Sequence, residues 1–481
     1  MAAVLALAFL PPARGAASSP IPDSERPVYI PYTEARPILE ALARVVPAEL
    51  KRDPETVAAR WAEWAAGRDA ETRSRLARGD DDSLVNLLMY GTSFTARPRI
   101  TAEYMAGLEE QDRRGGAAPS GVDRLTHAFL SRVDDLLTAL TSPGLDERLQ
   151  FMADLARREG FALERADGRS RLKEHLLADV SRVRSELAEH AKELAAARTP
   201  GDATQELAAR SKLFRNRGIS LDTSLLPNLA IEEALRALRG QGWLGPGGVR
   251  RAAIIGPGLD FVDKDEGYDF YPPQTVQPFA LVDSLLRLGL SRLETLMVTT
   301  LDISPRVNGH LALARERAGK RVGYVVQLPR DPGAPWKHET VRYWESFGEE
   351  VGAAADPVPV PAALGRLQVR AVRIRPEVVV RVRSLDVNAV WQRLELPPEE
   401  AFDLVVATNV LVYYDVLEQS LALANVGRML RPGGFLLSNN ALLELPVSPM
   451  RSVGYNTVVY SDRKDHGDHV VWYRGVPDAP P

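Results

Sequence analysis

The sequence contains no cysteine among its 481 residues, and this absence removes several classes of site. Without thiols the chain has no disulfide framework, no thiolate-bound zinc, no iron–sulfur cluster and no cysteine nucleophile. Radical chemistry at a cysteine-bound cluster is excluded for the same reason. Two histidines, His466 and His469, lie close together near the C-terminus, but no third ligand accompanies them. We interpret them as turn residues and expect no metal site.

The sequence also lacks long apolar runs and a strong excess of charge. Its first ten residues are apolar but too few to span a bilayer, and they lack the basic residues of a complete export signal. We therefore expect residues 1–26 to form the tail of a cytoplasmic protein; the alternative is export, with cleavage after Ala17. The net charge of -4 and the pI near 6.1 give no general attraction to nucleic acid or an anionic membrane. We expect no nucleic-acid partner and no membrane span.

The first half of the chain has a helical pattern. Apolar residues recur at three- and four-residue intervals across residues 27–244, which predicts an all-helical domain. Polar or Gly/Pro-rich loops are expected to interrupt the helices at residues 79–82, 113–119 and 198–202. The polar segment 213–227 either lies across a ligand cleft or packs between domains, and we favour packing.

The second half, residues 245–476, alternates strands and helices around a glycine bend. Residues 252–255 form a continuous apolar run, which is typical of a parallel strand buried on both faces. Gly256 and Gly258 follow, and because they carry no side chain the backbone can pass close beneath a ligand. A dinucleotide fingerprint needs a third glycine where this chain has Phe261, so NAD or FAD is the lesser interpretation.

Three further predicted strands end in polar residues: Asp302, Asp386 and Asn409. In open α/β sheets, ligands bind along the edge formed by the carboxyl ends of the strands. Asp302 is placed there to accept both hydroxyls of a ribose, and Asp386 to reach an adenine amino group. The alternative for Asp302 is a helix cap, a role that Ser304 can already fill. Residues 321–375 have the pattern of an insertion, and the chain ends in a predicted hairpin.

The ordered motifs at residues 300–304, 402–415 and 429–434 resemble those of class I S-adenosylmethionine-dependent methyltransferases, closest to the chemotaxis-receptor (protein-glutamate) branch. The resemblance implies a Rossmann-like α/β domain after the all-α domain. Its sheet would be seven-stranded and mostly parallel, with a C-terminal antiparallel hairpin. The implied cofactor is S-adenosylmethionine. The implied reaction is methyl transfer to an unidentified acceptor, either a protein carboxylate or a small molecule.

The resemblance also implies roles for single residues. Gly256 and Gly258 would underlie the methionine part of the cofactor, and Asn409 and Tyr413 would be catalytic, at the methyl end. The other implied cofactor-binding residues are Asp302, Ile303, Asp386, Val387 and Val410, together with Asn409. Further candidates for the acceptor pocket are Tyr414, Asp415 and the aromatic residues Tyr268 to Tyr271.

The chain departs from the family pattern at three positions. Ile254 and Asp260 replace a common acidic residue and a common glycine of the first motif, and Thr408 replaces the arginine usual in the chemotaxis branch. Together with the large helical domain, these departures favour an acceptor other than a receptor glutamate. They also leave a second hypothesis, in which a degenerate methyltransferase-like domain belongs to a non-catalytic helical scaffold protein.

Overall fold

The computed structural model describes residues 26–113, 120–197, 218–261, 267–463 and 466–475. The apolar N-terminal run, on which the alternative of export rested, lies outside these residues. So do the predicted loop at 198–202 and the beginning of the segment 213–227.

A seven-stranded sheet forms the centre of the second half, in the order β11-β12-β10-β9-β2-β3-β7. Its strands are β2 (Arg251–Ile255), β3 (Met297–Asp302), β7 (Val382–Asp386), β9 (Phe402–Ala407), β10 (Leu430–Ser438), β11 (Met450–Val459) and β12 (Gly467–Gly475). The pairs from β10 to β7 are parallel, and β12 runs antiparallel to both of its neighbours. The predicted mostly parallel sheet with a C-terminal hairpin is confirmed.

Helices cover both faces of this sheet because its central strands are apolar on both faces. Along β2, Ala252 and Ile254 belong to one hydrophobic core and Ala253 and Ile255 to the other, as the alternation of side chains in a strand requires. The first core contains α8 (Leu226–Gly240), α9 (Gln277–Arg287) and α10 (Pro305–Gly319). The second contains α1 (Tyr32–Ala41) and α13 (Val416–Met429).

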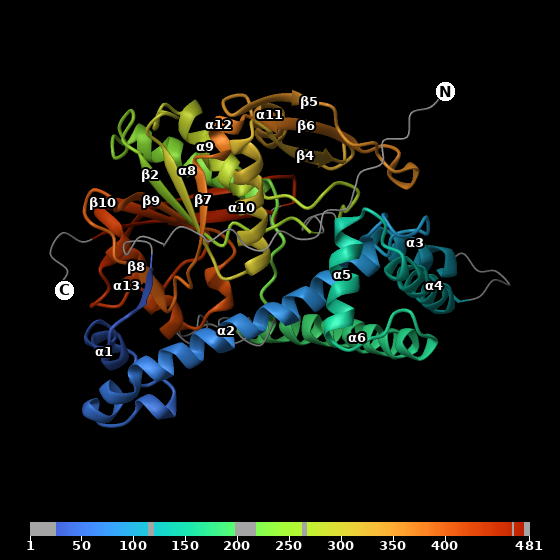
Figure 1. Ribbon diagram of the computed structural model, residues 1–481, viewed down its shortest axis with the longest axis horizontal. Coiled ribbons are helices and arrows are strands. Elements are labelled where there is room, and N and C mark those ends of the chain that lie inside the picture. The colour runs from blue at the N-terminus through green and yellow to red at the C-terminus, as the bar shows by residue number, and fades with distance from the viewer. Residues whose placement is uncertain (1–25, 114–119, 198–217, 262–266, 464–465, 476–481) are drawn as a thin grey trace.

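The remaining long helices form a separate group beside the sheet (Figure 1). They are α2 (Pro54–Tyr90), α3 (Ala102–Arg113), α4 (Gly121–Thr141), α5 (Glu147–Arg158) and α6 (Ala166–Ala197). These helices share a third hydrophobic core. It includes Phe261, which follows the glycine bend, so the helical group is anchored close to the bend. The buried guanidinium of Arg148 strengthens this anchor by donating to the carbonyls of Phe261 and Tyr271. No helix in the described ranges is long and apolar enough to cross a membrane.

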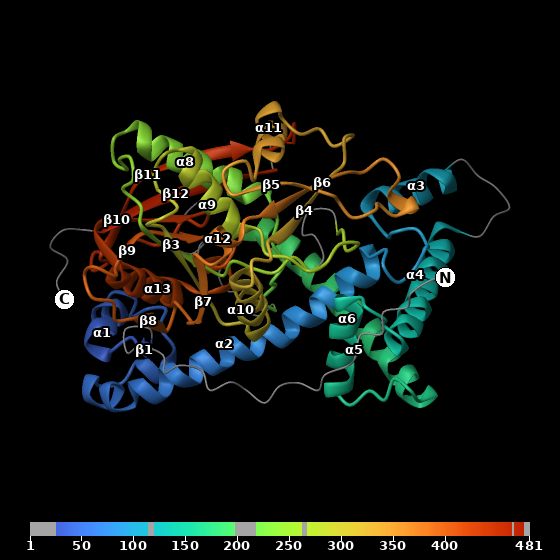
Figure 2. The ribbon, with the colours of Figure 1, turned by 45° about the horizontal axis from the view of Figure 1, so that its top comes forward.

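Helix α2 is continuous over 37 residues and passes beneath the sheet, from α1 at one end to the other members of the helical group, α3 to α6, at the other (Figure 2). The predicted loop at 79–82 is therefore wrong. A Cβ on Gly79 would lie 2.0 Å from the carbonyl oxygen of Ile219, so glycine is present to admit a second backbone. Asp80 pairs with Arg306 at 3.0 Å, and Asp82 pairs with Arg182 at 3.2 Å. The glycine and aspartates that made this stretch resemble a loop instead contact residues far away in the sequence.

The predicted all-helical half also contributes to the sheet domain. The short strand β1 (Pro27–Tyr29) pairs antiparallel with β8 (Gln392–Leu394), which the sequence did not indicate. Helix α8 shares the first core with the sheet. The domain boundary at residues 244–245 stays a prediction.

The segment predicted to be inserted forms its own antiparallel sheet, in the order β4-β6-β5. Its elements are β4 (Tyr324–Arg330), α11 (His338–Ser346), β5 (Gly352–Ala355) and β6 (Gln368–Ile374). The short helix α12 (Pro376–Val379) then leads into β7. The sequence also predicts the strand to begin at Val378, but Val378 and Val379 are helical. Single turns of 3-10 helix occur at η2 (Ala48–Leu50), η3 (Ala362–Leu364) and η4 (Leu411–Tyr413).

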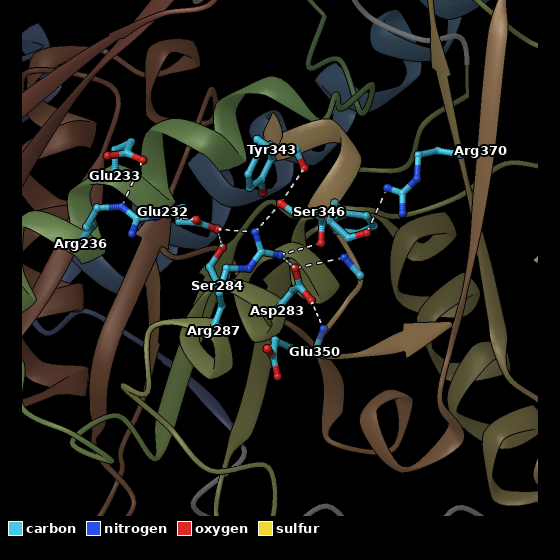
Figure 3. A network of polar contacts seen from close by, with 12 residues as sticks. Glu232, Glu233, Arg236, Asp283, Ser284, Arg287, Tyr343, Ser346, Glu350 and Arg370 are labelled. Carbon is cyan, nitrogen blue, oxygen red and sulfur yellow. Dashed lines mark hydrogen bonds and ion pairs between the residues drawn. The ribbon is translucent and has the colours of Figure 1, made fainter. Parts of the chain in front are cut away.

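A buried polar network fastens this inserted sheet to α8 and α9 (Figure 3). The carboxylate of Asp283 pairs with Arg287 and accepts hydrogen bonds from the backbone N–H groups of Gly348 and Glu350 at 3.1 and 3.0 Å. Arg287 also donates to the hydroxyl of Ser346 at 2.7 Å. Burial raises the pKa of Asp283, and the charge of Arg287 and the two amides oppose that rise.

Candidate functional site

A pocket lies at the carboxyl ends of the parallel strands, where the sequence predicted a ligand. The end of each of the four strands β2, β3, β7 and β9 leads into its wall. Of the predicted site residues, it is lined by Gly256, Gly258, Asp302, Ile303, Val387, Asn409, Val410 and Tyr413. Among the residues predicted to be catalytic or to bind the cofactor, Asp386 is the one outside the lining. The structure thus brings eight predicted residues together, while the roles assigned to them stay predictions.

The glycine bend packs tightly against other residues that line the pocket. Gly256 and Gly258 have φ angles of 64° and 74°, a conformation that other residues rarely adopt. A Cβ on Gly256 would lie 3.0 Å from the side chain of Val410, and one on Gly258 would lie 2.7 Å from the carbonyl oxygen of Leu221. The missing side chain of Gly258 therefore makes room for another part of the chain.

That part is the described portion of the polar segment, residues 218–227. It lines the pocket from Ile219 to Ser224, and Leu221 accepts a hydrogen bond from the N–H of Leu259 at 2.8 Å. Its other side packs on α2, where Ile219 N–H donates to the carbonyl of Arg75 at 3.2 Å. The segment thus combines both alternatives, because it packs between helix and bend and also covers the pocket.

Asp302 ends β3 with only 5% of its surface exposed. Its carboxylate accepts a hydrogen bond from the N–H of Ser304 at 2.7 Å. Burial raises the pKa of Asp302 to about 7, against the effect of that amide, and the charge of Asp386 adds to the rise. Ser304 itself caps α10 by accepting from the N–H of Val307 at 3.4 Å. Since Ser304 fills the capping position, Asp302 is available to face the pocket.

Asp386 is the register neighbour of Asp302 but is engaged elsewhere. Its carboxylate pairs with Arg73 of α2 at 2.7 Å, and 57% of its side chain is exposed. Arg73 also pairs with Asp69 at 3.1 Å. The pocket wall at this strand is made instead by Val387 to Val390. A contact between Asp386 and adenine stays a prediction that this geometry does not favour.

Asn409 is held in a left-handed conformation with φ at 57°, which asparagine tolerates better than most residues. Its N–H donates to the side-chain oxygen of Asn439, and the amide of Asn439 donates back to Asn409 Oδ1, both at 2.8 Å. This reciprocal pair fixes the side chain of Asn409 at the end of β9. Tyr413 lies one turn further on, and its carbonyl accepts from Arg75 of α2 at 2.9 Å.

A family model described as a methyltransferase domain matches residues 350–438 of this chain. The match includes β7, β9 and β10, and with them the pocket residues from Val387 to Tyr414. Gly256 and Asp302 lie outside the matched stretch, yet they line the same pocket. The chain carries an S-adenosylmethionine-dependent methyltransferase domain.

Other comparisons give short or distant similarities to this chain. The hybrid PKS-NRPS synthetase traA of Penicillium crustosum is 38% identical over 69 residues, which are 14% of this chain and 2% of that protein. Among solved structures, TrmN from Thermus thermophilus is 14% identical, with 52% of each chain covered and a TM-score of 0.24. The glycopeptide N-methyltransferase MtfA, complexed with sinefungin, is 15% identical, with 54% of this chain and 70% of that chain covered and a TM-score of 0.22.

The departure of the methyltransferase motif at Asp260 has a structural reason. Asp260 is 3% exposed and accepts from the hydroxyl of Tyr271 at 2.8 Å and from the amide of Gln274 at 3.1 Å. Burial raises the pKa of Asp260 to about 7, and the charge of Arg148 opposes the rise. Asp260 therefore holds the aromatic loop, a role that glycine cannot fill.

Of the described residues of this loop, Tyr268 and Tyr271 are not among those that line the methyltransferase pocket. They line a second cavity together with Asp260 and Trp336, and Ser224 lines both cavities, so their place beside the acceptor stays a prediction. Asp415 is also placed elsewhere, because it caps α13 by accepting from the N–H of Glu418 at 2.9 Å. Tyr414 does line the pocket, and burial raises its pKa above the ordinary range.

The sequence did not indicate that α2 closes one side of the methyltransferase pocket. Leu76 lines the pocket, and Arg73 donates to the carbonyl of Ile303 at 3.5 Å. One clue was present. The buried stripe of α2 is apolar at its start and turns polar further on, and its first members are Val57, Trp61, Ala65, Asp69, Thr72 and Arg75. Polar residues that continue an apolar stripe are buried too and need hydrogen-bond partners, which indicates that this part of the helix packs against polar groups.

The residues that line the pocket fit S-adenosylmethionine. Their charged members are Asp222 and Asp302, and the described lining contains no lysine or arginine. Two carboxylates suit the sulfonium and ammonium charges of this cofactor, and a buried carboxylate suits ribose hydroxyls. A dinucleotide would bring two phosphates into the same acidic surroundings, which is a poor electrostatic match.

Proposed function

We propose that this pocket binds S-adenosylmethionine, with its ribose at Asp302, and that the domain transfers the methyl group to a small-molecule acceptor. The observation that carries the proposal is the acidic lining, in which Asp222 and Asp302 are the charged side chains of the described residues. Gly256 and Val410 would then lie under the methionine part, and Val387 and Asn388 beside the adenine.

The chemistry depends on position more than on acid or base catalysis. When bound, the cofactor supplies an electrophilic methyl group on a positively charged sulfur. Holding the acceptor in line and excluding water supply most of the rate enhancement in such a displacement. Leu76 and residues 219–224 cover the pocket and so exclude water. Asn409 offers its amide N–H group to the pocket because Asn439 already occupies Oδ1.

The cover over the pocket favours a small acceptor over a folded protein. Residues 219–224 are held between the glycine bend and α2 by backbone hydrogen bonds on both sides. A protein side chain would have to pass this cover, whereas a small molecule can enter and be enclosed. The chemotaxis-receptor branch suggested by the sequence gains no support from the family match, and this chain has Thr408 where that branch usually has an arginine.

A second candidate is a non-catalytic protein that binds the cofactor or nothing at all. Titrating the full-length chain with S-adenosylmethionine in a calorimeter distinguishes an enzyme from a protein that binds nothing. Incubation with methyl-labelled cofactor and a fractionated cell extract distinguishes an enzyme from a protein that binds the cofactor without transferring its methyl group. We expect binding at one site and label in the low-mass fraction. Label in protein would overturn the small acceptor, and binding without any transfer would favour the non-catalytic form.

A further inference from the structure

Outside the pocket, three helices bring a histidine and carboxylates together. His175 and Asp179 lie one turn apart on α6, and Asp81 faces them from α2. One ligand atom from each of the three lies within 4.8 Å of the others. Glu159, at the end of α5, adds a fourth group, with Oε2 at 3.6 Å from His175 Nε2.

His175 and Asp179 are close but not hydrogen-bonded. His175 Nε2 lies 3.1 Å from Asp179 Oδ2, and both atoms are buried without a hydrogen-bond partner among the described residues. Only 8% of the surface of Asp179 is exposed. At this distance the direction of the ring nitrogen, and not the separation, prevents the bond. Both atoms are therefore free of hydrogen bonds to the described residues and available to a metal ion.

Two of the distances, from His175 to Asp179 and to Glu159, match those between ligands of one metal ion. Zinc lies about 2.0–2.2 Å from imidazole nitrogen and carboxylate oxygen, so two of its ligands stand about 3.0–3.6 Å apart. The separations of 3.1 and 3.6 Å from His175 Nε2 fall in this range. The ring of Phe161, with its centroid 5.3 Å from that of His175, helps to fix the imidazole.

The cluster also carries more negative charge than its neighbours balance. Among the described residues, Arg182 lies 3.4 Å from Asp179 Oδ1 and pairs with Asp82 as well. The like charges of Asp81, Glu159 and Asp179 repel one another. A bound cation would remove this repulsion.

We infer that Asp81, His175 and Asp179, with Glu159 beside them, form a site for a divalent transition metal of the zinc class. Imidazole with carboxylates suits Zn²⁺ or its neighbours, whereas Mg²⁺ and Ca²⁺ prefer oxygen ligands alone. This inference departs from the expectation of no metal site that we drew from the sequence. The ligands could not be recognised there because they lie on three helices and Asp81 stood in a predicted loop. The inference does not depend on the methyltransferase activity.

The place of the site suggests a structural role. Asp81 lies two residues from Gly79, where α2 contacts Ile219 of the pocket cover. A metal here would join α5 and α6 to α2 at the point where α2 supports that cover. We therefore expect the metal to raise thermal stability and to leave the chemistry at the pocket unchanged.

Zinc titration of the full-length, chelator-treated protein tests the site. We expect one Zn²⁺ per chain and a higher melting temperature with zinc, with no comparable effect of Mg²⁺. His175→Ala and Asp179→Asn should each weaken zinc binding at least about hundredfold, since even the loss of a group that only orients a ligand costs about 10–100-fold. The matched control is His127→Ala, which removes an exposed histidine of the same helical group and should bind zinc as the wild type does.

The outcomes separate a metal site from an ordinary ion pair. If the wild type binds no zinc at 100-fold excess over protein (about millimolar, far above structural zinc affinities), His175 is a charged partner of the carboxylates and the proposal is wrong. Equal binding by the wild type, His175→Ala and Asp179→Asn would place the ion elsewhere, for example at His466 and His469, and would overturn it too. Circular dichroism of both variants checks that they fold, and Asp179→Asn keeps the size of the side chain.

Discussion

Two buried carboxylates of the methyltransferase domain show how a structural site differs from a binding site. Asp283, at the joint with the inserted sheet, is 1% exposed and has a cation and two backbone amides as partners. Asp302, at the pocket, is 5% exposed and lies beside a second carboxylate, Asp386. Burial raises the pKa of both. Arg287 pairs directly with Asp283 and opposes the rise there, whereas Arg73, which opposes the rise at Asp302, pairs with Asp386 and Asp69.

The difference indicates where ligand chemistry is prepared. A compensated carboxylate contributes to the cohesion of the fold, and breaking its pairs costs stability. A carboxylate that is buried with few partners costs stability in the free protein and regains it when a ligand donates hydrogen bonds. The comparison therefore predicts that changes at Asp283 alter folding first, and changes at Asp302 alter binding first.

The largest effect is expected for Asp283→Ala, which leaves Arg287 and two amides buried without their acceptor. Removing one partner of a buried pair costs roughly 3–5 kcal/mol of unfolding free energy. Denaturant unfolding of the full-length chain measures it. Glu345→Ala is the matched control, because Glu345 is exposed on α11 of the same inserted segment and its loss should cost less than about 0.5 kcal/mol. If Asp283→Ala and wild type have equal free energies of unfolding, the contrast between a structural Asp283 and a ligand-binding Asp302 is wrong.

The next effect is expected for Gly258→Val, which changes the bend beside Asp302. A valine with φ at 74° is strained, and its Cβ would overlap the carbonyl of Leu221. Strain of this kind costs about 1–3 kcal/mol, so the segment over the pocket should shift and cofactor affinity should fall at least about tenfold. Gly245→Val is the control, since a Cβ on Gly245 meets nothing within 4 Å. Unchanged cofactor affinity in Gly258→Val would show that the glycine bend is not part of the cofactor site.

Asp302→Ala should weaken binding of S-adenosylmethionine by at least about tenfold while the protein stays folded. Charge-assisted hydrogen bonds contribute roughly 1.5–3 kcal/mol each, and tenfold corresponds to about 1.4 kcal/mol. Asp302→Asn should lose less because the amide keeps one acceptor oxygen. Calorimetry with the 2′-deoxy cofactor is the control: it should bind wild type poorly and the alanine variant no worse than the parent cofactor does.

Asp386→Ala sharpens this prediction, because Asp386 is the strand neighbour of Asp302. Its exposed pair with Arg73 contributes about 0–1 kcal/mol, so cofactor affinity should barely change. A large loss in Asp386→Ala would restore the contact with adenine that the family resemblance implied. If Asp302→Ala and wild type bind equally, Asp302 serves only the start of α10.

These residues also show how far the sequence could predict the site. Gly256, Asp302 and Asn409 were found because each follows an apolar run, and local pattern is enough to locate the end of a strand. Asp260 was noted only as a departure, since its partners come from a loop whose path no local pattern fixes. Helix α2 was predicted to break at 79–82 because glycine and aspartate are typical of loops. The contacts that keep those residues in a helix come from Ile219, Arg306 and Arg182, far away in the sequence.

A smaller effect than that of Asp302→Ala is expected for the pH dependence of cofactor binding, which belongs to Asp302 and not to Asp283. The pKa of Asp302 is raised to about 7 from an ordinary value of 3.8, so the free protein holds a proton there that the unfolded chain releases. Its contribution to stability is therefore present below pH 3.8 and is lost as the pH rises through 7. Cofactor affinity should change in the opposite direction, because ionised Asp302 accepts two hydrogen bonds and protonated Asp302 has given up part of that capacity.

We therefore expect the affinity for S-adenosylmethionine to rise about threefold to tenfold between pH 6 and pH 8, the range around a pKa of about 7. Calorimetry of wild type and Asp302→Asn side by side isolates the group, since Asp260 also has a pKa of about 7 and is present in both proteins. The asparagine variant should lose the rise. If both proteins show the same rise, Asp260 or the amino group of the cofactor is responsible, and the binding role of Asp302 no longer rests on its charge.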